Sequence, residues 1–349
     1  MNAPLRILLT VDPEIPVPPK LYGGIERIVD GIAAGLQLRG HSVGLVAHPA
    51  STCPVERLFS WPGAVSGNLR DGLMNTRALG AAVRLFRPDL VHSFSRLAYL
   101  LPLLARRVPA IMSYQRQTGG RKLRIAQAIG GRTFQFTTIS EYIAAMGRNG
   151  GGRWSVIPNF ADTGYYRFVQ EIPPDAPLVF LSRIERIKGA HTAIAIARQS
   201  GRRLVIAGNQ VDTAEGRAYW RTEIEPRLEP GKVEYVGAVD DAQKNALLGA
   251  AAALLVPIEW GEPFGIVFAE ALACGTPVIS CPLGALPEIV RDGEHGFLVR
   301  SVAEGVDAVG RLGGISRADC RRHAEQNFSR GVVVEQYEQL YRRLLEAPQ

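Results

Sequence analysis

Short apolar runs rich in β-branched residues alternate with helix-length amphipathic segments along most of the chain. RILLTVD (6–12) has the pattern of a strand, and GIERIVDGIAAGLQLRG (24–40) has the period of an amphipathic helix that ends at glycine. Later strand-like runs in the first half are HSVGLVAH, PDLVHSF, PAIMSY and FQFTTIS. This alternation predicts βαβ units, in which parallel strands are joined by right-handed crossovers.

The alternation pauses at residues 158–177, which contain four prolines and lack a helical period. A second series starts at LVFLSRI and continues through RRLVIAG, KVEYVG, AALLVP and TPVIS, and residues 330–345 have the pattern of an amphipathic helix. We therefore predict two Rossmann-like, doubly wound α/β domains at 1–160 and 178–329, joined by a linker at 161–177. Ligands bind such domains beyond the carboxyl ends of the strands, and two domains facing each other would form a deep interdomain cleft.

The length and composition are those of a folded two-domain protein. The chain has 349 residues, of which 46% are hydrophobic and 21% are charged. The N-terminal sequence lacks a secretion-signal pattern, and the longest apolar window, 246–258, is shorter than the roughly 20 residues of a membrane-spanning helix. We therefore expect a cytoplasmic protein. The four cysteines form no CxxC pair, so the sequence indicates neither a disulfide framework nor a zinc site.

The net charge of +7 is concentrated in one part of the sequence. Between Leu90 and Ser140 there is no Asp or Glu, and the basic residues are Arg96, Arg106, Arg107, Arg116, Arg121, Lys122, Arg124 and Arg132. Two interpretations stay open: a solvated surface, or a patch for phospholipid headgroups, a lipid-linked phosphate or an acidic glycan. The second would place the protein peripherally on the inner membrane face. Nucleic acid is not expected, because no recognition motif accompanies the charge.

Two loops next to predicted strand ends carry residues suited to phosphate. Gly23 and Gly24 stand where the loop after the first strand meets the first helix, so their N–H groups can approach a phosphate; the alternative is a simple tight turn. Arg183 and Lys188 follow the first strand of the second domain and suit a diphosphate; the alternative is a pair of exposed basic residues. There is no GxGxxG after the first strand and no Walker loop, which disfavours a nucleotide-dependent dehydrogenase.

The stretch GEPFGIVFAEALACGTPVI (261–279) places two acids in an otherwise apolar run. Glu262 would precede a helix, and Glu270 would lie about 12 Å further along. A sugar joined to a ribose through a diphosphate has a comparable length, so the two acids could accept hydroxyl hydrogen bonds at its two ends. The N–H groups that would face its phosphates belong to Phe264, Gly265 and Ile266. The alternative is one acid at a helix start and one solvated acid.

Together these motifs resemble the retaining glycosyltransferases of family 4, which have the GT-B fold. The resemblance covers nearly the whole chain, through YGGIERIV, RPDLVHSF, FTTIS, VIPNFAD, SRIERIKG, GEPFG…AEALACGTPVI and GALPEIVRDGEHGFLV. It implies that Glu270 binds the nucleotide ribose and that Glu262 holds hydroxyls of the donor sugar. It implies that the diphosphate is neutralised by Arg183 and Lys188, and it places near the donor Gly23, Gly24, Gly284 and Glu288. It also implies that the C-terminal helix, 330–349, returns to the acceptor-binding N-terminal domain.

Two positions depart from the pattern of the family. The family often has a His-x-His pair at the end of the strand PDLVHSF, but here His92 is followed by Phe94 at the second position. Either His92 substitutes as a catalytic contact, or the site lacks that contact. AGNQ (207–210) replaces a more usual acidic or glycine-rich turn near the base, which leaves the choice of nucleotide open.

The resulting hypothesis is transfer of a glycosyl group from a UDP- or GDP-linked sugar to an acceptor hydroxyl, with retention by resemblance, in cell-surface glycan or glycolipid synthesis. The chain has no Asp-x-Asp, so we expect no metal or other cofactor, and Arg183 and Lys188 would stabilise the departing diphosphate. A glycan, lipid-linked or small-molecule acceptor would bind loops 12–22, 92–98 and 114–122. The alternatives are another GT-B enzyme, such as a phosphorylase or epimerase, and an inactive homologue that binds a nucleotide-sugar or glycan.

Overall fold

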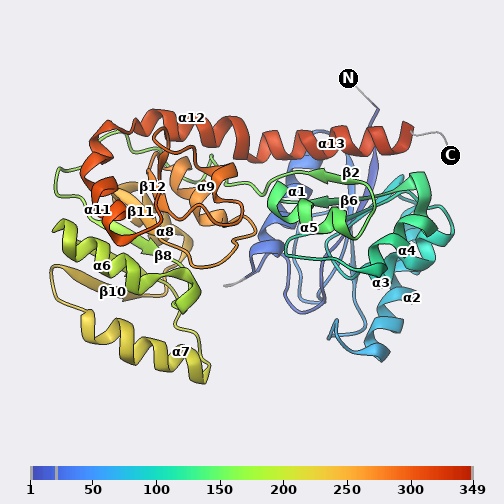
Figure 1. Ribbon diagram of the computed structural model, residues 1–349. Helices are drawn as coiled ribbons and strands as arrows, with labels where there is room; N and C mark the ends of the chain where they lie inside the picture. The colour runs from blue at the N-terminus through green and yellow to red at the C-terminus, as the bar shows by residue number, and fades with distance from the viewer. Residues whose placement is uncertain (1–2, 20–22, 347–349) are drawn as a thin grey trace. The chain divides into compact units, whose positions relative to one another are not determined.

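The computed structural model describes residues 3–19 and 23–346 (Figure 1). Its contacts divide the chain into two compact units, one formed by residues 1–159 with 330–349 and the other by residues 160–329. The segment 161–177, which the sequence predicts as a linker, therefore lies within the second unit. It is anchored there because its aromatic residue Tyr166 is buried and Val169 donates its N–H to the carbonyl of Cys274 at 3.1 Å.

The first unit is built on a seven-stranded parallel sheet with the order β3-β2-β1-β4-β5-β6-β7. Its strands are β1 (Arg6–Thr10), β2 (Ser42–Ala47), β3 (Arg57–Ser60), β4 (Leu90–Ser93), β5 (Ala110–Tyr114), β6 (Phe134–Thr138) and β7 (Trp154–Val156). The central strand β1 pairs with both β2 and β4, so Leu8 lies opposite Gly44 on one side and Val91 on the other. All these pairings are parallel, which confirms the predicted βαβ organisation.

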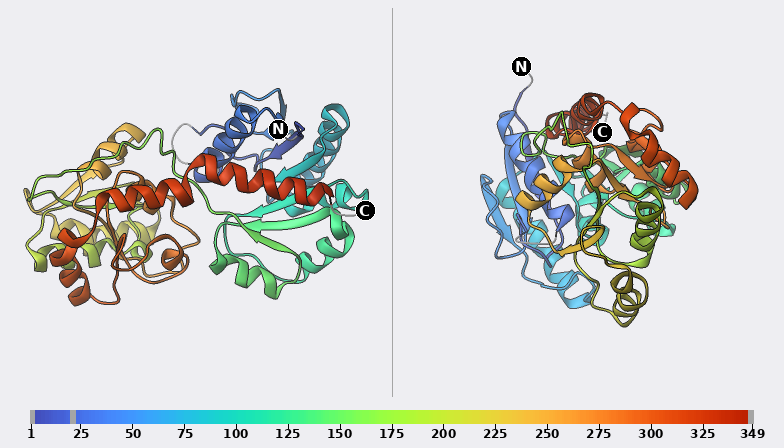
Figure 2. Two further views of the ribbon diagram at one scale, coloured as in Figure 1. Left: turned by 90° about the horizontal axis from the view of Figure 1, so that it is seen from above. Right: turned by 90° about the vertical axis from the view of Figure 1, so that its left-hand side faces the viewer.

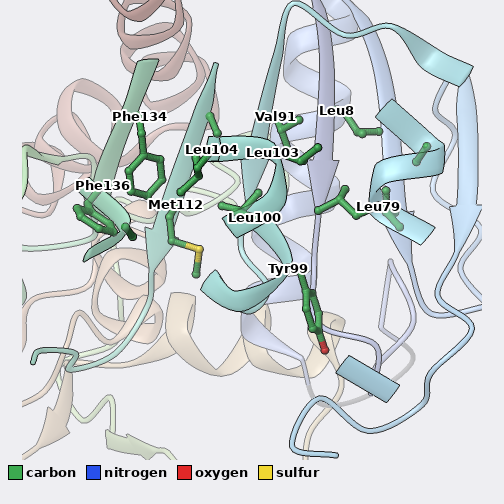
Figure 3. Close-up of a cluster of buried hydrophobic side chains, with 14 of the residues drawn as sticks. Leu8, Leu79, Val91, Tyr99, Leu100, Leu103, Leu104, Met112, Phe134 and Phe136 are labelled. Carbon is green, nitrogen blue, oxygen red and sulfur yellow. The ribbon is translucent and has the colours of Figure 1, made fainter. Parts of the chain in front are cut away.

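Helices on the two faces of this sheet bury its apolar side chains. They are α1 (Gly24–Leu38), α2 (Leu69–Phe86), α3 (Leu97–Ala105), α4 (Arg121–Gly130), the short η1 (Gly131–Thr133), α5 (Glu141–Asn149) and α13 (Arg330–Glu346). Helices α2, α3 and α4 contact one another in that order. With the strands they enclose a cluster that includes Leu8, Leu100, Met112 and Phe134 (Figure 3). The C-terminal helix α13 belongs to this unit and packs against α1 (Figure 2, left).

The second unit is built on a six-stranded parallel sheet with the order β10-β9-β8-β11-β12-β13. Its strands are β8 (Leu178–Leu181), β9 (Leu204–Ala207), β10 (Val233–Gly237), β11 (Ala253–Val256), β12 (Val278–Ser280) and β13 (Gly296–Leu298). Its helices are η2 (Arg186–Lys188), α6 (Ala190–Ser200), α7 (Ala214–Tyr219), the π-helical η3 (Trp220–Ile224), η4 (Glu225–Arg227), α8 (Asp241–Ala250), α9 (Ile266–Ala273), α10 (Leu286–Ile289), α11 (Val302–Arg311), η5 (Leu312–Gly314) and α12 (Arg317–Phe328).

The strand order of each sheet reverses at one place. In the first sheet the reversal lies between β1 and β4, and in the second it lies between β8 and β11. The connections after the two strands at such a point leave to opposite sides, and α/β proteins bind ligands in the opening that this creates at the carboxyl ends. These two places are therefore where each unit can hold a ligand.

Candidate active site

The switch point of the second sheet is formed by two loops that touch. The loop after β8 contains η2 and ends at Gly189, and the loop after β11 runs from Pro257 to Gly265. Gly189 has a φ of 77°, and a Cβ atom there would lie 1.9 Å from the carbonyl oxygen of Pro257. Only glycine therefore allows these loops to approach so closely, and the approach brings their side chains together.

Lys188 and Glu262 meet across this contact. The Nζ atom of Lys188 lies 2.6 Å from Oε2 of Glu262, and both side chains are buried. The same oxygen accepts a hydrogen bond from Nε1 of Trp260 at 3.0 Å, and the ammonium lies 4.5 Å from the centre of the Trp260 ring. Oε1 of Glu262 has no hydrogen-bond partner within residues 3–19 and 23–346. The sequence predicted both charged residues as site residues, and the structure brings them into direct contact.

The backbone of Glu262 is fixed by the loop after β12. Its carbonyl accepts the N–H of Ala285 at 2.8 Å. Gly284 has a φ of 64°, and a Cβ atom there would lie 2.3 Å from both the nitrogen and the carbonyl oxygen of Glu262. Gly284 thus contributes to the site by leaving room for the backbone of Glu262. Glu288 lies on α10 with an exposed side chain.

Glu270 lies on α9 and is the centre of a second polar cluster. Its Oε1 accepts a hydrogen bond from the hydroxyl of Tyr166 at 2.6 Å and lies 2.8 Å from Nζ of Lys244. Burial and the adjacent carboxylate raise the pKa of Tyr166 far above its usual range, so its hydroxyl stays protonated and donates. Within the described ranges, Oε2 of Glu270 has no hydrogen-bond partner. This carboxylate is therefore held by one oxygen, and the other can accept a bond from a ligand.

The start of α9 presents backbone N–H groups. Gly265 precedes the helix with a φ of 78°, and no side chain caps this end. A Cβ atom at Gly265 would lie 2.5 Å from the ring of Phe268, so glycine is required by space as well as by φ. The first N–H groups of a helix have no partner inside the helix and favour anions. The predicted positions Phe264, Gly265 and Ile266 thus form this end.

The remaining cation of the predicted diphosphate site, Arg183, follows β8 and is exposed. Its Nη2 lies 2.7 Å from Oε1 of Glu185 rather than near Lys188. The N–H of Ile184 next to it donates to the carbonyl of Asn209 at 2.8 Å, so the AGNQ turn after β9 lies beside this loop. Arg183 therefore lies at the predicted strand end, but its guanidinium is paired with Glu185, which a phosphate would have to replace.

In the first unit, Gly23 and Gly24 lie at the start of α1, as predicted. Gly23 has a φ of 153°, and its carbonyl accepts the N–H of Arg27 at 3.2 Å. The carboxylate of Glu26 folds back over this end, because its Oε2 would lie 2.9 Å from a Cβ atom at Gly23. The helix start already carries a negative charge. Tyr22, the other residue of the motif, lies outside the described residues.

The prediction that His92 is a catalytic contact does not fit its place in the structure. His92 lies in β4 and is fully buried. Its Nδ1 is 2.7 Å from the hydroxyl of Tyr341 on α13, and its Nε2 is 2.7 Å from Oγ of Ser113 on β5. Burial lowers the pKa of His92 to about 3, so the ring is neutral. Both nitrogens are occupied within the core, and the Phe94 ring lies against the His92 ring with a centroid distance of 4.3 Å and a tilt of 38°.

Sequence reasoning missed three residues that orient the acids: Tyr166, Lys244 and Trp260. Tyr166 lies in the proline-containing segment that resembled a linker, and Lys244 lies on α8 among other polar residues. Neither position carries a local signal, because the contacts with Glu270 span 104 and 26 residues of sequence. Trp260 could have been noticed, since an indole N–H two residues before a buried acid is a natural donor.

Within residues 3–19 and 23–346, no three His, Cys, Asp or Glu side chains are grouped so as to hold a metal ion. In the same ranges, no helix combines the length and apolar character needed to cross a bilayer.

Two doubly wound parallel sheets, one with an acid–lysine pair at its switch point, define a two-unit Rossmann-like protein. The chain matches the family described as Glycosyltransferase Family 4 over residues 22–165 and that described as Glycosyl transferases group 1 over residues 165–326. It belongs to the group 1 glycosyltransferases, and it is an enzyme of the transferase class with the GT-B fold. The resemblance seen in the sequence and the predicted fold class are thereby confirmed.

Individual relatives agree with this assignment. A glycogen synthase of Mycobacterium tuberculosis is 25% identical over 339 residues, which are 80% of this chain and 79% of the relative. The crystal structure of AviGT4, a glycosyltransferase involved in avilamycin A biosynthesis, is 28% identical and covers 99% of both chains with a TM-score of 0.73. Anabaena HepE in complex with UDP-glucose shares the fold at 19% identity, covering 96% of this chain and 99% of its own, with a TM-score of 0.71.

Proposed function

We propose that this glycosyltransferase moves a sugar from a UDP- or GDP-linked donor to an acceptor hydroxyl, with retention of configuration, in the synthesis of a glycan or glycolipid. The observation that carries the proposal is the pair of largely buried glutamates at and before α9, each of which is held by the protein through one carboxylate oxygen. Glu262 and Glu270 each use one oxygen for cationic or hydroxyl partners and leave the other without a partner within the described residues. Two such acceptors, with helix N–H groups between them, suit a nucleotide-sugar.

Each of these residues would contact a different part of the donor. Oε2 of Glu270 would accept a hydrogen bond from a ribose hydroxyl, and Oε1 of Glu262 would accept one from the donor sugar. The diphosphate between them would meet Lys188, Arg183 and the N–H groups at the start of α9. Negative charge grows on the diphosphate as the glycosidic bond breaks, so cations fixed in advance stabilise the transition state. The acceptor would attack the same face that the diphosphate leaves, with oxocarbenium character at the sugar.

Metal independence is part of the proposal. The neutralisation of the diphosphate is assigned to Lys188 and Arg183, since the chain contains no Asp-x-Asp motif. Turnover should then persist in excess EDTA. The donor class is supported by Anabaena HepE, which was crystallised with UDP and with UDP-glucose. A glycan product is supported by the relatives named glycogen synthase.

We extend the proposal to contact with an anionic membrane through α3 and α4. Helix α3 (LAYLLPLLA) has no charged residue, and its outer positions Ala98, Pro102 and Ala105 are exposed. The exposed basic residues on and beside these helices are Arg106, Arg107, Arg121, Lys122 and Arg124. An apolar strip bordered by arginine and lysine suits anionic headgroups. Cosedimentation with anionic but not zwitterionic vesicles at low salt is expected, and failure to sediment would remove this extension.

The test of the proposed donor site is calorimetric titration of UDP, GDP and ADP into the wild type and Glu270→Gln. One nucleotide should bind at micromolar concentration to the wild type and more weakly to the variant, because a neutral amide is a poorer acceptor than a carboxylate. Glu294→Gln, an exposed acid on the loop before β13, is the matched control and should bind as the wild type does. If no nucleotide binds the wild type, the proposal fails.

Turnover of the proposed donor is tested separately from binding. Release of nucleotide from the intact nucleotide-sugar, in the presence of varied acceptors, should accompany binding.

A further inference from the structure

Arg321 on α12 uses its guanidinium to bind backbone carbonyls of the second unit. Its Nη1 donates to the carbonyls of Tyr166 at 2.8 Å and Ala273 at 2.6 Å, and its Nη2 donates to that of Thr163 at 2.8 Å. Its Nε donates to Oε1 of Glu325, one turn later on the same helix, at 2.6 Å. Four of the five N–H donors of this guanidinium therefore have protein acceptors, and the group is held in one orientation.

The carbonyls that Arg321 binds come from two segments next to Glu270. Ala273 is the last residue of α9, the helix on which Glu270 lies, and a cation suits the negative end of a helix. The other two carbonyls belong to one turn, in which the N–H of Tyr166 donates to the carbonyl of Asp162 at 2.9 Å. The guanidinium thus ties this turn to the end of α9.

The contacts close a ring that contains Glu270. The hydroxyl of Tyr166 donates to Oε1 of Glu270 at 2.6 Å, and the carbonyl of the same tyrosine accepts from Arg321. Arg321 also binds the last carbonyl of α9, which returns the ring to the helix that carries Glu270. Tyr166 and Glu270 are both buried. Side chains whose supports are themselves fixed hold a ligand-binding geometry more closely than a single contact does.

We propose that Arg321 is a positioning residue for the nucleotide: it fixes the main chain of Tyr166, and the tyrosine hydroxyl in turn orients the carboxylate of Glu270. The inference rests on the proposed function, in which Glu270 accepts a hydrogen bond from a ribose hydroxyl. Without the guanidinium, Glu270 would stay on its helix but would be less well oriented. The loss should therefore fall on recognition of the ribose and not on the diphosphate.

Arg317 on the same helix offers a matched control. It lies one turn before Arg321, and both arginines are partly buried. Its partners are the carbonyls of Val169, Ala251 and Gly249 at 2.6, 2.9 and 2.9 Å, Oγ1 of Thr276 at 3.0 Å and the carbonyl of Cys274 at 3.5 Å. These partners are of the same kind, but they lie outside the ring that contains Glu270.

The experiment is calorimetric titration of the ribonucleoside diphosphate that binds the wild type, and of its 2′,3′-dideoxy form, at a temperature where each variant is folded. Lysine keeps the charge of Arg321 but replaces the planar fork by one ammonium, which cannot hold the separate carbonyls in the same way. Arg321→Lys should bind the ribonucleotide about threefold to tenfold more weakly than the wild type does, and the dideoxy form within about twofold. Arg317→Lys should bind both forms as the wild type does.

A double-mutant cycle separates action through Tyr166 from a general loosening of the unit. Residues that act through one another have effects that are not additive. Arg321→Lys should therefore cost little further affinity for the ribonucleotide when Tyr166→Phe is already present. If Arg321→Lys does not fold, Glu325→Gln serves instead, because Glu325 is exposed and its carboxylate orients the guanidinium; it should weaken the ribonucleotide and not the dideoxy form.

The outcomes distinguish this inference from the proposed function. The positioning role is overturned, and the donor site stands, if the variant binds the ribonucleotide as the wild type does or loses both forms equally. Losses that multiply in the double mutant, or an equal loss in Arg317→Lys, overturn it as well. If the wild type binds both forms equally, the ribose contact of Glu270 and the positioning role fail together, and nucleotide binding stands. If the wild type binds no nucleotide, the proposed function fails and the inference fails with it.

Discussion

Replacement of His92 by glutamine should destabilise the first unit and leave the chemistry intact. The two ring nitrogens of His92 satisfy two buried hydroxyls, those of Tyr341 and Ser113, each at 2.7 Å. A glutamine amide can replace one of these bonds but not both. Ser113 also bonds the hydroxyl of Thr137, so the costly case is the hydroxyl of Tyr341, and a buried hydroxyl left without a partner costs about 1–3 kcal/mol. We therefore expect His92→Gln to lose stability of that order at pH 7, with the loss located where β4 and β5 contact α13.

The pH dependence of unfolding gives a second, independent magnitude for the contribution of His92 to the free energy of unfolding. The folded state does not protonate His92 until pH falls to about 3, whereas an unfolded histidine has a pKa of about 6.5. The unfolded chain therefore binds the extra proton first, and stability falls as the pH decreases below 6.5. Between pH 7 and pH 5 this difference amounts to about 2 kcal/mol for one histidine. His92→Gln should lack this component, so its stability should change less than that of the wild type over the same range.

The assay is urea unfolding of the full chain at pH 7 and pH 5, with the transition of the first unit identified by hydrogen exchange in the β4 and β5 peptides. His48→Gln, on the loop after β2, is the control for loss of a histidine outside the core. Release of nucleotide from the donor should stay within about twofold of the wild type at temperatures where the variant is folded. A variant that is as stable as the wild type but has lost turnover would show that His92 acts on the substrate.

Two other substitutions test the second unit. Tyr166→Phe removes one of the two groups that hold Oε1 of Glu270, so nucleotide affinity measured by calorimetry should fall by about threefold to tenfold. An unchanged affinity would show that Lys244 alone holds the carboxylate in place. Gly189→Ala should prevent stable folding, because its Cβ would lie 1.9 Å from the carbonyl oxygen of Pro257. Gly201 also has a positive φ, of 66°, but no atom lies near the place of its Cβ. Gly201→Ala should therefore lower the free energy of unfolding only by the roughly 1–2 kcal/mol of left-handed strain. Equal melting temperatures for the two alanine variants would contradict the steric argument.

The sequence was sufficient to predict the fold where strands are buried on both faces. The runs that became β1, β2, β4, β5 and β6 are rich in apolar residues and buried at nearly every position, because helices cover both sides of a parallel sheet. The strands β3, β7 and β13 escaped prediction. Strand β3 is mostly exposed and β7 and β13 each have three residues, so none of them forms a long apolar run. At these positions strand formation depends on pairing with a neighbour rather than on local pattern.

The charged residues of the candidate site could be predicted from the sequence, but the residues that hold them in place could not. Lys188, Glu262 and Glu270 are recognisable because charged groups in apolar surroundings need partners. Their spatial neighbours come from distant parts of the chain, and no periodicity encodes such contacts. His92 shows the opposite error. A polar residue at a strand end suggests a ligand contact, but all four residues of β4 are buried, so its histidine lies inside the unit rather than at its edge.

The ion pair between Lys188 and Glu262 has a consequence for how the proposed donor would bind. Both groups are buried, and loss of one partner from a buried pair leaves an uncompensated charge that costs more than the pair itself contributes. Before binding, each group therefore supplies the partner that the other needs and holds it in place. A diphosphate brings negative charge to the lysine, and a sugar hydroxyl brings a donor to the acid, so the ligand can supply the partners that the pair gives up. The same reasoning applies to Glu270, whose lysine and tyrosine partners hold one oxygen while the other awaits a hydroxyl. In this view each carboxylate keeps one oxygen on its protein partners, and the other oxygen is the one that accepts a hydroxyl of the ligand.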